Sequence, residues 1–283
     1  MTMQDFNKTC FNISKYITNA YSTSFGWGIR AFSPEYRNAI YSIYAYVRLA
    51  DEIVDTFHDY DKKTLLREFR LETYNSIDKG ISTNPVINAF QKTAKEYNIG
   101  LDLINSFLDS MEQDLFNSFY NRIEYDNYIY GSAEVVGLMC LKVFVKGNEK
   151  NYNRLLQPAK MLGSAFQKVN FLRDIKSDLD ERGRIYLPGV ESKLLINDYN
   201  KKLLEQEIEK EFQEALIGIK RLPIGVRLGV YSAYMYYYRL FKKIKKLKVK
   251  DLLNRRVRIS NFRKILLLAK TIINVNIAKL IFE

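Results

Sequence analysis

Apolar side chains recur every three or four residues along most of the chain, which is the spacing of one face of an α-helix. With few breaks between these stretches, the pattern predicts roughly ten helices joined by short connections. They span residues 5–24, 33–57, 62–78, 84–97, 101–120, 124–146, 158–180, 199–220, 224–248 and 260–281. Gly26 and Gly28 are expected to form a turn, and Pro158 is expected to begin the helix at 158–180. Only 5 prolines and 13 glycines interrupt the 283 residues, without a repeat or a linker, so we expect an all-α fold in a single domain, residues 1–283.

The helix predicted at residues 33–57 carries an acidic row beside its buried row. The apolar row is Ile40, Ile43, Val47, Ala50 and Val54, and the row next to it is Tyr41, Tyr44, Arg48, Asp51 and Asp55. Adjacent rows border the same packed face of a helix, so Asp51 and Asp55 are expected at the edge of the core. Such a pair is also typical of a solvated helix end, whereas the tyrosines and the apolar neighbours favour ligands for a hard cation such as Mg²⁺.

The helix predicted at residues 158–180 repeats this arrangement. Asn170, Asp174 and Asp178 are spaced by four residues and therefore share a face. The apolar row beside them is Leu162, Ala165, Val169 and Leu172. Two such helices that face each other across a cavity would present oxygen ligands from both walls. Arg48 and Arg173 adjoin the carboxylates and suit bidentate contact with phosphate.

Local signals in two neighbouring segments concern shape. Gly131, Ala133 and Gly137 are small enough to let a helix or a ligand approach closely. Gly183 is expected to end the second acidic helix, and Pro188 to keep the following chain extended. The basic residues on either side of Gly183, Arg182 and Arg184, either fold over a bound polyphosphate or offset the helix dipole, and the sequence favours neither interpretation.

Composition and single residues exclude several classes of protein. The chain is 47% hydrophobic without low-complexity tracts, which is typical of a soluble globular protein. No signal peptide or transmembrane helix is visible, since Lys270 and Lys279 interrupt the apolar stretch 265–282. The single His58 rules out a His-based zinc site and disfavours a Ser-His-Asp triad. Cys10 and Cys140 show no pairing or metal spacing, so a cytoplasmic location is expected.

The formal net charge of +12 is concentrated near the C-terminus. From Lys220 onward, 17 Lys and Arg residues face only Asp251 and Glu283. Such a block binds nucleic acid, an anionic membrane or an anionic substrate, or keeps the protein in solution. No nucleic-acid motif accompanies it, so no nucleic-acid partner is expected. We expect residues 239–250 and 260–281 to make peripheral contact with the inner face of an anionic membrane, with a solvated basic helix as the alternative.

Four segments, in the same order, resemble the squalene/phytoene synthase family of head-to-head prenyltransferases, and bacterial phytoene synthases most of all. The segments are residues 22–25, 44–55, 128–137 and 167–178, the last continuing to 183–188. The resemblance implies an isoprenoid synthase fold with two facing Asp-rich helices around a central cavity. The chain departs from the family pattern at Glu52, where many members have aspartate, and at Glu134, where relatives often have glycine. The first departure leaves the ligand spacing intact, and the second places an acid in a segment of small residues.

The resemblance also implies roles for individual residues. The implied catalytic residues are Arg48, Asp51, Asp55, Arg173, Asp174 and Asp178. The implied Mg²⁺ ligands, which would also accept Mn²⁺, are Asp51, Asp55, Asn170 and Asp174, with Asp178 in support. The implied substrate-binding residues are Tyr21, Ser22, Thr23, Ser24, Phe25, Tyr44, Arg48, Tyr128, Gln167, Arg173, Arg184, Tyr237 and Arg256.

The implied reaction joins two geranylgeranyl diphosphates through a cyclopropyl (prephytoene) diphosphate to phytoene, with release of diphosphate, in carotenoid biosynthesis. NADPH is not expected for this product. The alternative is condensation of farnesyl diphosphate to dehydrosqualene or squalene. A more remote alternative, a non-catalytic assembly factor of the same fold, is disfavoured because both acidic helices are intact. The resemblance also allows a product-accepting enzyme as a partner, although the sequence does not identify one.

Overall fold

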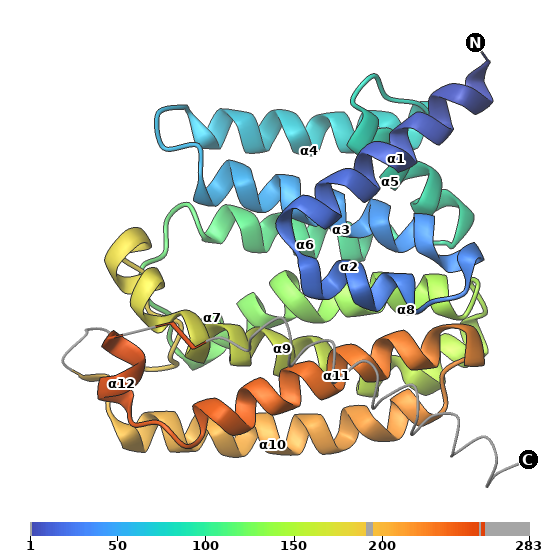
Figure 1. The fold of residues 1–283 in the computed structure, drawn as a ribbon. Helices are drawn as coiled ribbons and strands as arrows, with labels where there is room; N and C mark the ends of the chain where they lie inside the picture. The colour runs from blue at the N-terminus through green and yellow to red at the C-terminus, as the bar shows by residue number, and fades with distance from the viewer. Residues whose placement is uncertain (1, 191–194, 255, 258–283) are drawn as a thin grey trace, which may run out of the picture.

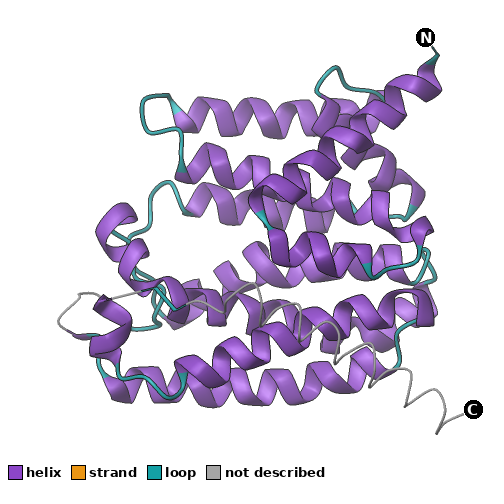
Figure 2. Cartoon of the chain, in the orientation of Figure 1, coloured by secondary structure: helices purple, strands orange, loops and turns teal. Residues whose placement is uncertain are grey.

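The long helices lie roughly parallel to one another across the molecule, joined by short loops (Figures 1 and 2). The computed structural model describes residues 2–190, 195–254 and 256–257, and these ranges contain no β-strand, only an isolated bridge between Phe119 and Ile185. The helices are α1 (Met3–Tyr21), α2 (Thr23–Arg30), α3 (Pro34–Asp55), α4 (Lys62–Lys79), α5 (Pro85–Glu96), α6 (Leu101–Gln113), α7 (Arg122–Ile129), the π-helical segment η1 (Tyr130–Glu134), α8 (Val135–Phe144), α9 (Glu149–Arg182), α10 (Asp198–Lys220), α11 (Ile224–Ile244) and α12 (Val249–Asn254). The predicted all-α fold is confirmed, and the helix predicted at 260–281 lies outside the described residues.

Local capping fixes several helix ends where the sequence places them. The side chain of Asn84 accepts hydrogen bonds from the backbone N–H groups of Val86 and Ile87 at the start of α5. Gly183 adopts a left-handed conformation (φ 66°) and ends α9, as predicted. Ser33 stands at the start of α3 ahead of Pro34, although its hydroxyl makes no capping bond. These ends are local events, so sequence patterns predict them well.

Two predicted breaks between helices are wrong, one at Pro158 and one at Gly26 and Gly28. Pro158 does not begin a helix but lies inside α9, which starts at Glu149. The proline ring packs against Gly218 of α10, where an added Cβ would come within 2.3 Å of the Pro158 Cβ. Packing between α9 and α10 therefore holds a helix through a residue that lacks an N–H donor. Gly26 and Gly28 form no turn, since they lie within α2.

Two other helices are shorter than predicted. The helix expected at 101–120 ends at Gln113, so the segment 114–121 is free to form a loop. The stretch expected at 124–146 is divided into α7, η1 and α8. At η1 the small residues bring helices close, as the sequence indicates: a Cβ on Gly131 would lie 2.4 Å from the carbonyl oxygen of Ser106, and one on Gly163 of α9 would lie 2.6 Å from that of Ala133.

The core surrounds α3. Its Tyr46 is completely buried and stacks on Phe90 of α5 at 3.8 Å between ring centroids. The same ring contacts Phe69 of α4 and Phe107 of α6. The predicted apolar row of α3 is buried except for Val47, which is half-buried. Tyr41 of the neighbouring row turns into the core, while the rest of that row borders the cavity described below. Within the described residues, no helix has the length and apolar character needed to cross a bilayer.

Candidate active site

A cavity of about 1020 Å³ lies between the helices, with one polar and one apolar part. The C-terminal halves of α3 and α9 supply the polar part. The apolar part is lined by the N-terminal halves of α3, α9 and α11 and by α2, α8 and α10. The two acidic rows thus border one cavity, in agreement with the prediction that their helices face each other across it.

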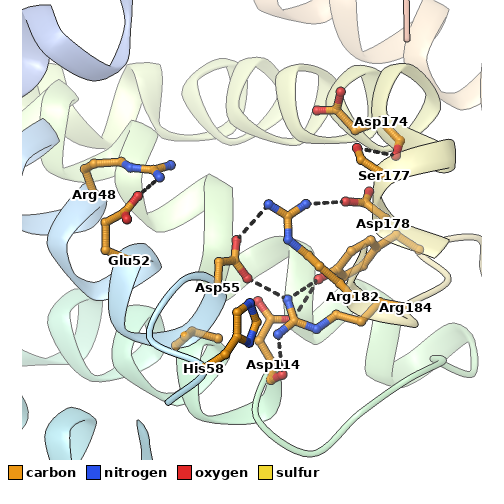
Figure 3. A network of polar contacts seen from close by, with 12 residues as sticks. Arg48, Glu52, Asp55, His58, Asp114, Asp174, Ser177, Asp178, Arg182 and Arg184 are labelled. Atoms are coloured by element: carbon orange, nitrogen blue, oxygen red, sulfur yellow. Dashed lines mark hydrogen bonds and ion pairs between the residues drawn. The ribbon is translucent and has the colours of Figure 1, made fainter. Parts of the chain in front are cut away.

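The first acidic row enters the cavity from α3. Tyr44, Arg48, Asp51 and Asp55 all line it. Arg48 forms an ion pair with Glu52 (Figure 3). Its guanidinium carbon also lies 4.4 Å from the ring centroid of Tyr21. The acid that departs from the family pattern is therefore the partner of an arginine in the site.

The second acidic row enters from α9. Gln167, Asn170, Arg173, Asp174 and Asp178 line the cavity. Their apolar row is also as predicted, because Ala165, Val169 and Leu172 are completely buried and Leu162 borders the cavity. The spacing of four residues therefore gives the face of α9 that the sequence indicates.

Arginines connect and neutralise the carboxylates (Figure 3). The Arg182 guanidinium lies between the two rows, with Nη1 2.7 Å from Asp178 Oδ1 and Nη2 3.4 Å from Asp55 Oδ2. Arg184 Nη1 lies 2.8 Å from Asp55 Oδ1 on the other side. Asp174 is paired with Arg173 and with Arg256, whose Nε is 2.6 Å from Asp174 Oδ1. The polar part of the cavity is thus an alternation of acids and arginines.

Burial and mutual repulsion change the protonation of two of these acids. Burial, together with the charge of Asp55, raises the pKa of Asp51 to about 7, against the opposing effect of Arg48. Burial and the charge of Asp174 likewise raise the pKa of Asp178 to about 7, although Arg182 opposes the shift. Both carboxyls therefore titrate near neutral pH while no cation is bound.

Aromatic rings separate the polar part of the cavity from the apolar part. Phe166 stacks on Tyr237 with 4.0 Å between ring centroids. Phe25 contacts both Tyr44 at 5.5 Å and Tyr237 at 6.4 Å. Burial raises the pKa of Tyr44 to about 12, with a hydrogen bond to Ser22 opposing the shift, so its phenol stays protonated. Deeper in the cavity, Phe32 and Phe144 make an edge contact at 5.3 Å.

The structure brings most of the predicted substrate-binding residues to this cavity. Those that line it are Tyr21, Ser22, Phe25, Tyr44, Arg48, Tyr128, Gln167, Arg173, Tyr237 and Arg256. Arg184 does not line it, because its guanidinium lies behind Asp55 and bonds to the Asp114 carbonyl. The side chains of Thr23 and Ser24 lie outside the described part of the structure.

Sequence reasoning missed three residues of the polar part. Asp114, Arg182 and Tyr186 line the cavity, although none was singled out as a site residue. Asp114 follows the buried Met111 by three residues, which was the available signal for an acid on an apolar face. The segment carrying Arg182 was considered for polyphosphate contact, with helix capping as the equal alternative. In the structure Arg182 contacts acids of both rows, which capping alone does not require.

The side chains at the polar end of the cavity carry the oxygen donors that a divalent cation prefers, although several of these carboxylates are paired with arginines. Among the described residues, no group of three His, Cys, Asp or Glu side chains is gathered closely enough to hold a metal. The donors are nonetheless hard oxygens, and the Oδ1 atom of Asn170 is buried without a hydrogen-bond partner in the described structure. A divalent cation that displaced the Arg182 guanidinium would balance the negative charges of Asp55 and Asp178 in its place.

The basic segment 239–250 has part of its positive charge paired with an acid. Lys242 Nζ lies 2.9 Å from Glu209 Oε1, and Lys245 Nζ lies 2.8 Å from Glu209 Oε2. One acid of α10 therefore offsets part of the charge of two lysines.

The described residues have the arrangement that the family resemblance implies, an isoprenoid synthase fold with two Asp-rich helices at one end of a central cavity. The sequence pattern of the squalene/phytoene synthase family matches residues 18–195, so the chain belongs to this family. Members of the family are prenyltransferases that condense prenyl diphosphates head to head.

Individual relatives agree with this assignment. The chain is 29% identical over 244 residues to the chloroplastic phytoene synthase of Daucus carota, a match that covers 79% of this chain and 60% of that protein. It is 26% identical over 212 residues to the 4,4'-diapophytoene synthase of Staphylococcus haemolyticus, covering 74% of this chain and 70% of that one. A dehydrosqualene synthase crystallised with a ligand has the same fold, with a TM-score of 0.80, 22% identity and coverage of 96% of this chain and 98% of that chain.

Proposed function

We propose that the chain condenses two geranylgeranyl diphosphates, through a cyclopropyl (prephytoene) diphosphate, to phytoene. The observation that supports this proposal is the position of two carboxylate rows and their arginines at one end of an apolar, aromatic-lined cavity. A diphosphate with a long hydrocarbon chain has the same division into a charged end and an apolar tail. Family membership supports the reaction type, and the choice of geranylgeranyl diphosphate is the finer part of the proposal.

The polar part of the cavity would bind the diphosphate and stabilise its departure. Mg²⁺ held by Asp51, Asp55, Asn170 and Asp174, with Asp178 in support, would neutralise negative charge as the allylic carbon–oxygen bond breaks. Arg48, Arg173, Arg182 and Arg256 lie at the same end and would contact the phosphate oxygens. Each of these arginines is now paired with a carboxylate or lies beside one, so binding of diphosphate would exchange those partners.

The apolar part would protect the allylic cation that remains. Water would convert this cation to an alcohol, so the reaction needs a cavity from which water is excluded. The faces of Phe166 and Tyr237 lie at the boundary between the two parts, where a delocalised cation forms and aromatic rings can stabilise it without reacting. In the first condensation, the allylic cation adds to the double bond of the second diphosphate, and loss of a proton closes the cyclopropyl ring. Departure of the second diphosphate, rearrangement and loss of another proton then give the linear hydrocarbon.

Product identity tests the proposal directly. Purified protein is incubated with Mg²⁺ and either farnesyl or geranylgeranyl diphosphate, with and without NADPH, and the extracted hydrocarbon is identified by mass spectrometry. We expect phytoene from the geranylgeranyl substrate, independent of NADPH, and no product when Mg²⁺ is chelated. A C30 product alone would replace this proposal by the farnesyl route. No turnover of either diphosphate would favour a non-catalytic role.

A further inference from the structure

A buried carboxylate that the family motifs do not include organises the polar end of the cavity. Asp114 is 7% exposed and accepts hydrogen bonds from three phenols. The Oδ1 atom receives one from Tyr120 at 3.0 Å and one from Tyr186 at 2.9 Å, and the Oδ2 atom receives one from Tyr128 at 2.7 Å. Three convergent donors on one buried carboxylate fix its position, and the bonds from Tyr128 and Tyr186 favour its charged form. Burial is the larger effect and raises the pKa of Asp114, with the charge of Arg184 opposing it.

Arg184 connects this carboxylate to the first acidic row (Figure 3). Its Nη2 atom donates to the backbone carbonyl of Asp114 at 2.7 Å, and its Nη1 atom lies 3.9 Å from Asp114 Oδ1. The same Nη1 atom donates to Asp55 Oδ1 at 2.8 Å and to the Tyr186 hydroxyl at 3.2 Å. One guanidinium thus bridges a buried carboxylate that lies outside both acidic helices and an acid of the proposed metal site.

The backbone of the same two segments is also joined. The N–H of Ile185 donates to the carbonyl of Ser118 at 2.8 Å, and the N–H of Gly189 donates to that of Tyr120 at 3.1 Å. The ring of Tyr186 stacks on Phe171 of α9 with 4.2 Å between centroids and 5° between planes. Residues 184–190 are therefore fixed on one side to the loop after α6 and on the other to α9.

The two arginines that contact Asp55 differ in how they are held. Arg184 is 10% exposed in its side chain and bonds to Asp114, Tyr186 and Asp55. Arg182 is 31% exposed in its side chain, and its ion-pair partners among the described residues are the two acids Asp55 and Asp178. Arg184 is thus the fixed cation and Arg182 the exchangeable one.

We propose that Asp114 is a positioning residue, which holds Arg184 against Asp55 and so fixes the orientation of that carboxylate at the polar end of the cavity. The inference rests on the proposed function. A carboxylate that must engage a cation and a diphosphate loses effectiveness when it is displaced by even about 1 Å. Removing the charge of Asp114 leaves Arg184 with a weaker anchor, and Asp55 is then free to turn toward Arg182 alone.

A double-mutant cycle between Asp114 and Arg184 separates positioning from other roles. Asp114→Asn is expected to lower kcat by about ten- to hundredfold, the cost of a misplaced group. In the Arg184→Gln background the same change should cost no more than about twofold, because the connection has already been lost. If Asp114→Asn does not fold, Tyr186→Phe replaces it in the cycle, because this change keeps the charges of both Asp114 and Arg184. The decrease in kcat caused by Tyr186→Phe should also disappear in the Arg184→Gln background.

Asp109→Asn is the matched control. Asp109 lies on α6, one turn before the helix ends, and also pairs with an arginine, with Arg70 Nη1 2.8 Å from its Oδ1, but it lies outside the cavity. Its activity should equal that of the unmodified chain. A loss at Asp114 that persists undiminished in the Arg184→Gln background would overturn the proposal and indicate direct contact between Asp114 and the reactants. Full activity of Asp114→Asn would also overturn it.

Amide hydrogen exchange tests the anchor without reference to turnover. Asp114→Asn should accelerate exchange in residues 184–190, while α4 keeps the exchange of the unmodified chain. If the unmodified chain turns over no prenyl diphosphate, the proposed function fails, and this measurement alone decides whether Asp114 anchors the segment. Unchanged exchange at 184–190 would then refute the anchor.

Discussion

Arg184 and Asp55 are 129 positions apart in the sequence, yet Nη1 of the arginine lies 2.8 Å from Oδ1 of the aspartate. The contact joins the segment after α9 to the last residue of α3, and so connects the ends of the two acidic helices. Arg182 makes a second connection between the same helices through Asp55 and Asp178. Arginine side chains therefore connect the ends of the two acidic helices, and this pairing affects mutation, cation binding and pH dependence.

Loss of one carboxylate from either row should abolish turnover. Asp51→Asn and Asp174→Asn each remove a negative charge from the proposed cation site, and we expect a loss in kcat of at least about a hundredfold. Release of diphosphate measures the rate, and circular dichroism should show unchanged helix content. Near-normal activity in either variant would remove that residue from the proposed site.

Arg182→Gln should strengthen cation binding in the absence of substrate. The guanidinium now neutralises Asp55 and Asp178, and its removal leaves both acids available to a divalent ion. We expect Mn²⁺ affinity, measured by calorimetry, to rise roughly three- to tenfold, the effect of a partly exposed ion pair. Lys176→Gln, at an exposed position of the same helix, is the control for net charge. Equal affinities in the two variants would show that Arg182 does not compete with the ion.

The cation-free protein should lose stability as the pH rises toward neutrality. Asp51 and Asp178 have pKa values of about 7 in the folded protein against 3.8 in the unfolded chain, so the folded state binds protons more tightly. The free energy of unfolding then falls between about pH 4 and pH 7. Each acid contributes less than about 4 kcal/mol, since one pKa unit corresponds to about 1.4 kcal/mol and cavity water screens the charges.

Thermal midpoints in chelator at pH 5 and pH 7.5 measure this effect. The Asp51→Asn variant should show a smaller decrease across that range than the unmodified chain, because it lacks one of the titrating groups. A decrease of the same size in both proteins would assign the pH dependence to other residues.

The close approach of α9 and η1 should make Gly163 sensitive to a single methyl group. A Cβ at this position would lie 2.6 Å from the carbonyl oxygen of Ala133 and 3.1 Å from the Cα of Glu134. Gly163→Ala should therefore destabilise the protein by about 1–3 kcal/mol in denaturant unfolding. At Gly28 the nearest such atom is 3.8 Å away, so Gly28→Ala should change stability by less than about 1 kcal/mol. Equal effects of the two changes would contradict the packing at η1.

If the basic segment 239–250 contacts a membrane, Glu209 should weaken that contact. This acid pairs with both Lys242 and Lys245, whose side chains are 44% and 42% exposed. Glu209→Gln should increase co-sedimentation with vesicles containing anionic lipid, and added salt should reverse the increase. Binding that is equal in both proteins and insensitive to salt would exclude an electrostatic contact of this segment.

The sequence by itself determined the helical class, most helix starts and both acidic rows. These features depend on residues three or four positions apart, such as Asp51 with Asp55 and Asp174 with Asp178, so a periodic pattern contains them. The end of α9 at Gly183 was equally predictable, because a left-handed glycine terminates a helix through local bonds.

Tertiary structure decided where the helices bend, end and meet. Pro158 remains inside α9 because Gly218 of α10 leaves room for its ring. Helix α6 stops at Gln113, and the Asp114 carboxylate just beyond it accepts hydrogen bonds from three tyrosine hydroxyls. Arg184 was predicted to bind substrate but lies behind Asp55, since its partners are supplied by the loop after α6. Each of these outcomes depends on a contact with a residue far away in the sequence. Such a contact contributes to the free energy of folding only after the helices have packed.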